Sequence, residues 1–594
     1  MKIFLWLIKA CTLILEDKKE WDYKDVELLK IIVCAQVLNP EKDSKYFVDL
    51  PLKREINDII NDFEEIKGEL GLKNKSLSKK RKNYKTLNIL IYQTIFSVLN
   101  LNEKIEELDI KKIMEESKDL QKRKKIINDF LKKNFKEVGS DLEDYDEKEF
   151  FTNISQLPFM ENVKDEKMRE IVKSILHIWT KLSKKSVENV DSSLIPLKFP
   201  FIVPGGRFRE FYYWDSLWIL QGLLICDMKK AAKYLVLNFI DLINKYGFIP
   251  NGTRAYYSRR TQPPLFCMML IKLYNHSTEF HDLVLGKGLE AAMKEYNFLK
   301  ENKSCEIVVK EKRYQMYVYK VEGNYPRPES LKEDFQNWYN ASGVRKNELY
   351  KSLKTSAESG IDFSSRWFTD PKDIKTIDIL NRIPVDLNAI VYQNLCILQK
   401  LNFLVNKKFI VKKLEVEAKM LKNAINELMW DEETLQWRDF VISENKQAEK
   451  RTYFSNFYPM IFDIKPPSCE IKDVYQYNRD YFMDCDGGVV AGEEICDVDQ
   501  QWDYPNIWPP YNQLIIEFLD KSDETKKDAL ILAKKFFESV KIGFDEKNVF
   551  YEKYNTLFPG SSGSGGEYEP QSGFGWTNGT VLYIIQNFGQ RLIG

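Results

Sequence analysis

Carboxylate side chains recur in loop-like segments that are rich in aromatic residues, glycine and proline. Cleavage of a glycosidic bond needs one protonated carboxyl group as an acid and one ionised carboxylate as a base or nucleophile. Aromatic rings suit the apolar faces of a sugar, so these segments predict glycosidic bond cleavage. Composition and spacing alone do not select the two catalytic groups. The candidate carboxylates are Glu329, Glu358, Asp362, Asp503, Glu567 and Glu569.

Two further loop-like segments carry polar donors among aromatic rings. PGGRFREFYYWDSLW, at residues 204–218, holds Arg207 and Asp215. These two residues either bond sugar hydroxyls in a subsite or form an ion pair that staples a rigid turn. PNGTRAYYSRRTQPP, at residues 250–264, supplies several arginine and amide donors. An arginine cluster also suits phosphate, but no glycine-rich loop of the phosphate-cradling kind accompanies it.

Composition argues against metal and nucleic-acid chemistry. The chain has nine cysteines without C-x-x-C pairs, and its three histidines lack the spacing of metal ligands on a helix. We therefore expect no metal site. The 89 basic and 89 acidic residues cancel, so no net field favours nucleic acid or an anionic membrane. Nothing in the sequence specifies an oligomeric state.

Long periodic segments predict helices at residues 227–246, 386–406, 411–429 and 526–541. In the first of them, apolar residues repeat at the 3.6-residue spacing of one helix face, and Gly247 follows as a stop signal. Strand signatures are few, and loops rich in glycine, proline and aromatic residues separate the helices. This alternation is typical of an α/α toroid, an all-α fold with the loops gathered at one end.

The leading section of the chain is more polar than the rest. We expect residues 1–190 to form a helical section packed on a catalytic barrel of residues 191–594, with an insertion at 73–107. The basic run at 73–85 is typical of a solvated loop. The apolar run at 1–15 is too short to span a membrane. We interpret it as the opening helix of a soluble cytoplasmic protein, with the signal peptide of a secreted protein as the alternative.

Several long blocks carry a family likeness. PGGRFREFYYWDSLW and QWDYPNIWPP resemble the two signature motifs of the trehalase family, glycoside hydrolase family thirty-seven. ESGIDFSSRWF and GGEYEPQSGFGWTNG are similar to two further blocks of that family. The likeness extends to residues 36–53, 129–143 and 177–185, and thus over nearly the whole chain in one order. It implies an (α/α)6 toroid that has no cofactor and hydrolyses trehalose with inversion.

The resemblance also implies roles for individual residues. The family's general acid is the Asp of an S-G-x-D block, which here is Asp362, and its general base is the Glu of a G-G-E-Y block, here Glu567. The implied substrate contacts are Arg207, Trp214, Asp215, Asn251, Arg260, Thr261, Gln262, Arg327, Pro328, Glu329 and Gly360.

Three positions depart from the family's pattern. Leu217 stands where the first signature usually has Tyr, Ile507 where the second usually has a small residue, and Ile361 where Trp commonly precedes the acidic Asp. None of the three removes a charged site residue. Ile361 is the neighbour of Asp362 and so belongs to the environment that sets its pKa.

Two other functions compete with trehalose hydrolysis. The same toroid and carboxylates would serve another α-glucoside, and a panel of trehalose, maltose and sucrose separates these substrates. A sugar-binding or sensing protein descended from a hydrolase would have lost a catalytic carboxylate. Asp362 and Glu567 are both present, so the sensing function ranks last.

Overall fold

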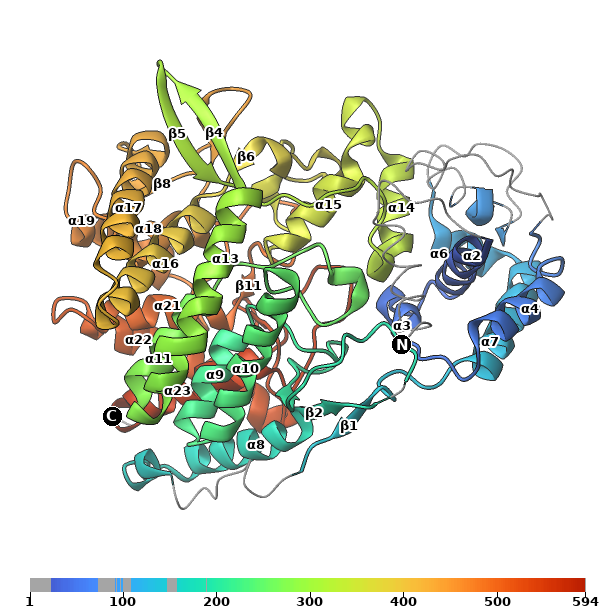
Figure 1. The fold of residues 1–594 in the computed structure, drawn as a ribbon, viewed down its shortest axis with the longest axis horizontal. Coiled ribbons are helices and arrows are strands. Elements are labelled where there is room, and N and C mark those ends of the chain that lie inside the picture. Colours follow the sequence, from blue (N-terminus) through green and yellow to red (C-terminus); the bar gives the residue numbers. More distant parts are fainter. Residues whose placement is uncertain are drawn as a thin grey trace.

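The computed structural model describes residues 23–72, 91, 93–96, 98–99, 108–146, 157–188 and 190–592. Most of these residues are helical and the strands are short, which confirms the all-α class (Figure 1). The apolar run at 1–15 and the basic run at 73–85 lie outside the described residues, as does most of the predicted insertion at 73–107.

Six helices form a closed inner ring. Each packs against the next in chain order, and the last packs against the first. Their side chains are buried nearly all round, which is why their sequences are apolar on more than one face. The inner helices are α9 (Ser216–Ile225), α11 (Phe266–His276), α16 (Val385–Leu404), α18 (Tyr458–Ile461), α21 (Pro509–Leu519) and α23 (Gly575–Leu592).

A second set of helices covers the outside of this ring. α8 packs on α23, α10 on α9, α13 on α11 and α16, α17 on α16, α19 on α18, and α22 on α21. Two concentric sets of six helices are the predicted (α/α)6 toroid. The outer helices are α8 (Glu166–Leu182), α10 (Lys229–Tyr246), α13 (Leu289–Asn302), α17 (Lys408–Met429), α19 (Ile471–Tyr477) and α22 (Lys526–Lys547).

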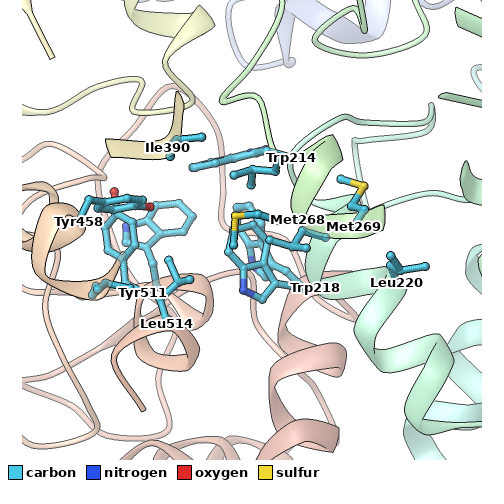
Figure 2. Close-up of a cluster of buried hydrophobic side chains, with 14 of the residues drawn as sticks. Trp214, Trp218, Leu220, Met268, Met269, Ile390, Tyr458, Tyr511 and Leu514 are labelled. Carbon is cyan, nitrogen blue, oxygen red and sulfur yellow. The ribbon is translucent and has the colours of Figure 1, made fainter. Parts of the chain in front are cut away.

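The interior of the toroid is a packed core. Figure 2 shows buried side chains of the inner helices lying near one another. They include Trp218 of α9, Met268 of α11, Ile390 of α16, Tyr458 of α18 and Tyr511 of α21. Because this core is filled, the space for a ligand lies at one end of the ring, among the loops.

The N-terminal helices form a second core beside the toroid. In Figure 1 they lie to one side of the barrel, with α14 (Leu331–Asn340) next to them. α14 and the barrel residues Tyr212 and Tyr257 belong to this core, so the N-terminal helices pack against barrel loops. The helices are α2 (Tyr23–Val37), α3 (Ser44–Val48), α4 (Ile56–Ile66), α6 (Ile110–Glu116) and α7 (Lys118–Asn134).

The described strands form small antiparallel sheets, most of them within loops. The predicted division of the chain at residue 190 stays a prediction, and α8, which precedes it, packs in the outer ring. The sheets are β1 (Leu142–Asp144) with β2 (Ser183–Ser186) and β3 (Phe201–Ile202); β4 (Ser304–Val309) with β5 (Lys312–Tyr317); β6 (Arg382–Ile383) with β9 (Phe440–Val441) and β10 (Lys446–Gln447); β7 (Trp430–Asp431) with β8 (Gln436–Trp437); and β11 (Asn506–Ile507) with β12 (Tyr554–Asn555).

The motif-bearing loops meet at the N-terminal ends of the inner helices. Trp214 lies two residues before α9, Trp508 directly precedes α21, and Phe574 directly precedes α23. All three line one cavity, so the predicted gathering of loops at one end is confirmed. Within the described ranges, no helix is both long enough and apolar enough to cross a membrane.

Candidate active site

The cavity at the loop end of the toroid encloses about 690 Å³ of space between protein atoms, part of which is open to solvent. All of the predicted site residues except Thr261 and Pro328 line it. Segments more than 300 residues apart in the sequence, such as those of Arg207 and Glu567, therefore meet around one space.

Thr261 and Pro328 do not line the cavity but hold the loops that form it. The Thr261 backbone N–H donates to Glu358 Oε1 at 3.1 Å, and its hydroxyl donates to the carbonyl of Ile249 at 2.7 Å. The carbonyl of Pro328 accepts from Gln36 Nε2 at 2.8 Å. Both residues thus fix loop backbone, and neither lines the space a substrate would occupy.

Asp362 lies in a tightly held loop after α15 (Leu349–Glu358). Gly360 precedes it with a φ of +74°, and a Cβ there would lie 2.9 Å from the Trp214 ring, so glycine allows this close approach. Gln501 Nε2 donates to the Asp362 carbonyl oxygen. The Ser365 N–H donates to Asp503 Oδ2 at 2.7 Å beyond it. The backbone on both sides of Asp362 is therefore fixed.

Burial raises the pKa of the half-buried Asp362 carboxyl to about 7. The nearby Arg327 and Arg260 guanidiniums oppose this shift, and the charge of Glu567 adds to it. A carboxyl group with this pKa carries a proton in a large fraction of molecules at neutral pH, as a general acid must. Burial, with the charges of Glu552 and Asp362, likewise raises the pKa of Asp215 to about 8.

Glu567 is held by two donors from one loop. Arg327 Nη2 donates to Oε1 at 2.7 Å, and Ser330 Oγ donates to Oε2 at 3.1 Å. Arg327 is itself fixed, because its Nη2 also donates to Asp334 Oδ1 at 2.6 Å. A charge-assisted bond of this kind suits an ionised carboxylate, and the Glu567 side chain keeps 22% of its surface exposed.

Arg260 and Arg207 are anchored by other acceptors. Arg260 Nη2 donates to Glu329 Oε1 at 2.7 Å and to Asn251 Oδ1 at 3.0 Å. Arg207 Nη2 donates to Asp43 Oδ1 at 2.7 Å, and its guanidinium lies 4.2 Å from the centre of the Tyr568 ring. The alternative in which Arg207 staples its own turn by pairing with Asp215 is therefore wrong, since its partner comes from the N-terminal section.

The backbone near Trp214 is fixed by an amide side chain. Gln262 Oε1 accepts from the Trp214 N–H at 3.0 Å, so this predicted contact also joins the first and second loop segments. The Trp214 ring lies 5.4 Å from that of Trp502, which stacks on Trp508 at 3.7 Å. These rings give one side of the cavity an aromatic wall of the kind that covers sugar faces.

Several lining residues were not among the predicted site residues. Most of them lie inside the sequence blocks that predicted the site. Their position in those blocks is the sequence feature by which they could have been predicted. Glu552 lies in no such block; its Oε1 accepts from Tyr568 OH at 2.8 Å, and burial raises its pKa. The additional lining residues are Phe208, Tyr212, Tyr257, Ser330, Ala357, Gln501, Trp502, Trp508, Glu552, Tyr568, Phe574 and Trp576.

Three of the candidate carboxylates, Glu358, Asp503 and Glu569, do not line the cavity. Glu569 is exposed, whereas Asp503 and Glu358 are buried. Asp503 and Glu358 each accept a hydrogen bond from a backbone N–H group of a loop. Arg254, one of the donors in the second segment, is fully buried and pairs with Asp141 at 2.6 Å. Across the part of the chain that the structure describes, no group of three or more His, Cys, Asp and Glu side chains is placed to hold a metal ion.

Comparisons with known proteins point to one family. The family model described as Trehalase matches residues 92–589. The trehalase of Dictyostelium discoideum is 32% identical over 593 residues, which cover 96% of this chain and 90% of the relative. The trehalase of Apis mellifera is 34% identical and covers 78% of this chain and 76% of the relative. The trehalase of Homo sapiens is 34% identical, with 73% and 76% covered.

A solved structure agrees with this at the level of the fold. The neutral trehalase Nth1 from Saccharomyces cerevisiae superposes with a TM-score of 0.53 at 22% identity, over 66% of this chain and 75% of that one. The family model and the sequence relatives each cover most of the chain. The protein therefore belongs to the trehalase family.

Proposed function

We propose that the protein hydrolyses trehalose to two glucose molecules with inversion, with Asp362 as general acid and Glu567 as general base. The observation that carries this proposal is that one cavity holds both carboxyl groups in different environments. Asp362 has a pKa of about 7 because of burial, whereas Glu567 accepts from Arg327 and Ser330. The names of the sequence relatives support the choice of substrate.

The chemistry is a single displacement. Asp362 gives its proton to the glycosidic oxygen as the bond to the anomeric carbon breaks. Glu567 takes a proton from a water molecule, whose oxygen attacks that carbon from the opposite face. The attacked glucose leaves as the β anomer and the other keeps its α configuration. No bond forms between sugar and protein, so no glycosyl-enzyme accumulates.

The remaining lining residues are proposed to hold the two glucose units. Arg207, Arg260, Asn251, Glu329 and Asp215 present donors and acceptors to sugar hydroxyls. Arginine suits this role because its planar fork fixes more than one acceptor at once. The wall formed by Trp214, Trp502 and Trp508 would cover apolar sugar faces, and Gly360 leaves room for the Trp214 ring.

Substitution of the two carboxyl groups tests the assignment. Asp362→Asn and Glu567→Gln should each fold and lose almost all turnover of trehalose, because each removes one half of the proton transfer. Glu569→Gln is the matched control, since this exposed glutamate lies two residues from the proposed base and outside the cavity lining. It should change turnover little. Comparable losses in Glu569→Gln and Glu567→Gln would overturn the assignment of the base.

A substrate panel tests the choice of disaccharide. The wild-type protein should hydrolyse trehalose and leave maltose and sucrose essentially intact. A higher kcat/KM for maltose or sucrose would replace trehalose in the proposal while leaving the two carboxyl groups in place. A protein that binds trehalose without hydrolysing it would instead support a sensing function.

A further inference from the structure

A buried lysine lies between the two segments that carry Asp362 and Glu567. Lys553 directly precedes β12, is fully buried, and does not line the cavity. Its Nζ donates to Gln501 Oε1 at 3.1 Å, to the Ser564 carbonyl at 2.9 Å and to the Gly565 carbonyl at 3.3 Å. An ammonium has three N–H donors, so all three are used.

These three bonds lead to both proposed catalytic groups. Gln501 Nε2 donates to the carbonyl oxygen of Asp362 itself. On the other side, Gly565 lies two residues before Glu567 in the chain. A continuous path therefore runs from Asp362 to Glu567. Hydrogen bonds join Asp362 to Gln501, Gln501 to Lys553 and Lys553 to Gly565, and two residues of backbone lead from Gly565 to Glu567.

The turn before Glu567 fits closely against the Gln501 amide. Gly566 has a φ of +91°, and a Cβ added there would lie 2.8 Å from Gln501 Oε1. The turn has a second anchor, because the Ser564 N–H donates to Asn506 Oδ1 at 2.8 Å. A shift of the Gln501 amide would therefore move the turn and the Asp362 carbonyl together.

Burial of the Lys553 ammonium group lowers the stability of the fold. Among the residues whose positions are described it forms no ion pair within 4.0 Å, and the three oxygens that accept its hydrogen bonds are all neutral. Burial lowers its pKa to about 8, with opposing contributions from the charges of Glu552, Asp499 and Asp362. Burying a cation without a counter-ion costs stability, and such costs concentrate where function requires them.

We infer that Lys553 is a positioning residue that sets the placement of the general acid relative to the general base, through Gln501 on one side and the Gly565–Gly566 turn on the other. This inference rests on the proposed function of Asp362 and Glu567. An inverting pair must leave room for one water molecule between base and sugar, so its separation tolerates little change. Lys553 would act on kcat rather than on substrate binding.

Lys553→Met tests the inference, with Lys535→Met as the matched control. Lys535 is a partly buried lysine whose Nζ donates to two backbone carbonyls, those of Met483 at 2.6 Å and Cys485 at 3.0 Å, away from the cavity. Lys553→Met should lower kcat for trehalose about 100-fold, the loss expected from a misplacement of about 1 Å. Its KM should change less than about threefold, because ground-state contacts remain. Lys535→Met should keep wild-type kcat.

A double-mutant cycle gives the readout that a merely structural role would not produce. If Gln501 and Lys553 act as one unit, Gln501→Leu with Lys553→Met should lose about as much kcat as the more damaging single variant alone. Circular dichroism and thermal melts confirm folding, and Lys553→Gln replaces Lys553→Met if the latter does not fold. Losses that multiply, or near-wild-type kcat for the folded Lys553 variant, would overturn the inference. A wild-type protein inactive on trehalose would overturn the proposed function instead.

Discussion

At the residue scale, two carboxyl groups receive different environments from the same cavity. Both residues are partly buried, but desolvation raises the pKa of the Asp362 carboxyl and favours its protonated form, whereas Glu567 accepts from Arg327. Matching to the family's sequence blocks selected these two residues. It did not select Glu552, which lines the cavity from outside any recognisable block.

The pKa of Asp362 predicts the pH dependence of the reaction. Its folded-state pKa of about 7 lies above its usual value, so the proton needed for catalysis is present below pH 7 and is lost as the pH rises. We expect kcat/KM for trehalose to decline with a midpoint near pH 7. Initial rates measured from about pH 5 to about pH 9 check this. A profile that stays flat up to about pH 9 would contradict a pKa near 7 for the general acid.

Arg327→Lys tests the donor that holds Glu567. A lysine cannot reproduce the fork by which Arg327 contacts Asp334 and Glu567 together. We expect kcat/KM to fall by the equivalent of about 2–4 kcal/mol, as for the loss of other preorganised donors. Arg313→Lys is the control, because that side chain is 76% exposed and lies outside the cavity lining. Equal activity of the two variants would argue against a role for the fork.

At the scale of elements, helices were predictable where periodicity is strong. The segments predicted at 227–246 and 386–406 correspond to α10 (Lys229–Tyr246) and α16 (Val385–Leu404), and Gly247 ends α10 with a φ of +85°. The loop contacts were not predictable, because the partners come from distant parts of the chain. Arg207 binds Asp43 of the N-terminal section, and no local pattern marks that pair.

Asp43→Ala tests whether the N-terminal section helps to build the site. Asp43 accepts from Arg207 and also caps α3 by accepting from the Lys45 N–H at 2.9 Å. Hydrogen bonds to charged groups contribute about 1.5–3 kcal/mol, so we expect kcat/KM to fall about tenfold or more. Asp109→Ala is the control, because Asp109 caps α6 by accepting from the Lys112 N–H at 3.1 Å. The neighbouring Leu108 N–H donates to Asn340, which does not line the cavity.

Both aspartate variants should lose about 1 kcal/mol of stability, as is usual for the loss of a helix cap. Melting temperature and kcat/KM measured on the same samples separate stability from activity. If Asp43→Ala and Asp109→Ala have the same kcat/KM, the contact between Asp43 and Arg207 does not shape the site.

At the scale of the whole molecule, the toroid supplies a filled core and the loops at one end supply the chemistry. The N-terminal helices pack on those loops through a second core that includes α14, directly after Arg327, Glu329 and Ser330. The sequence predicted that the N-terminal section packs on the barrel but not which barrel residues form the shared core, because these come from separate segments, such as those of Tyr212, Tyr257 and Phe335. The division at residue 190 stays a prediction.

The central claim is a single displacement by Asp362 and Glu567, and proton NMR of a fresh reaction with trehalose tests it most directly. Anomeric signals recorded before mutarotation should show equal amounts of α-glucose and β-glucose, because one unit keeps its configuration and the other is inverted. Early spectra that contain only α-glucose would indicate a retaining mechanism with a covalent intermediate, and would contradict the account.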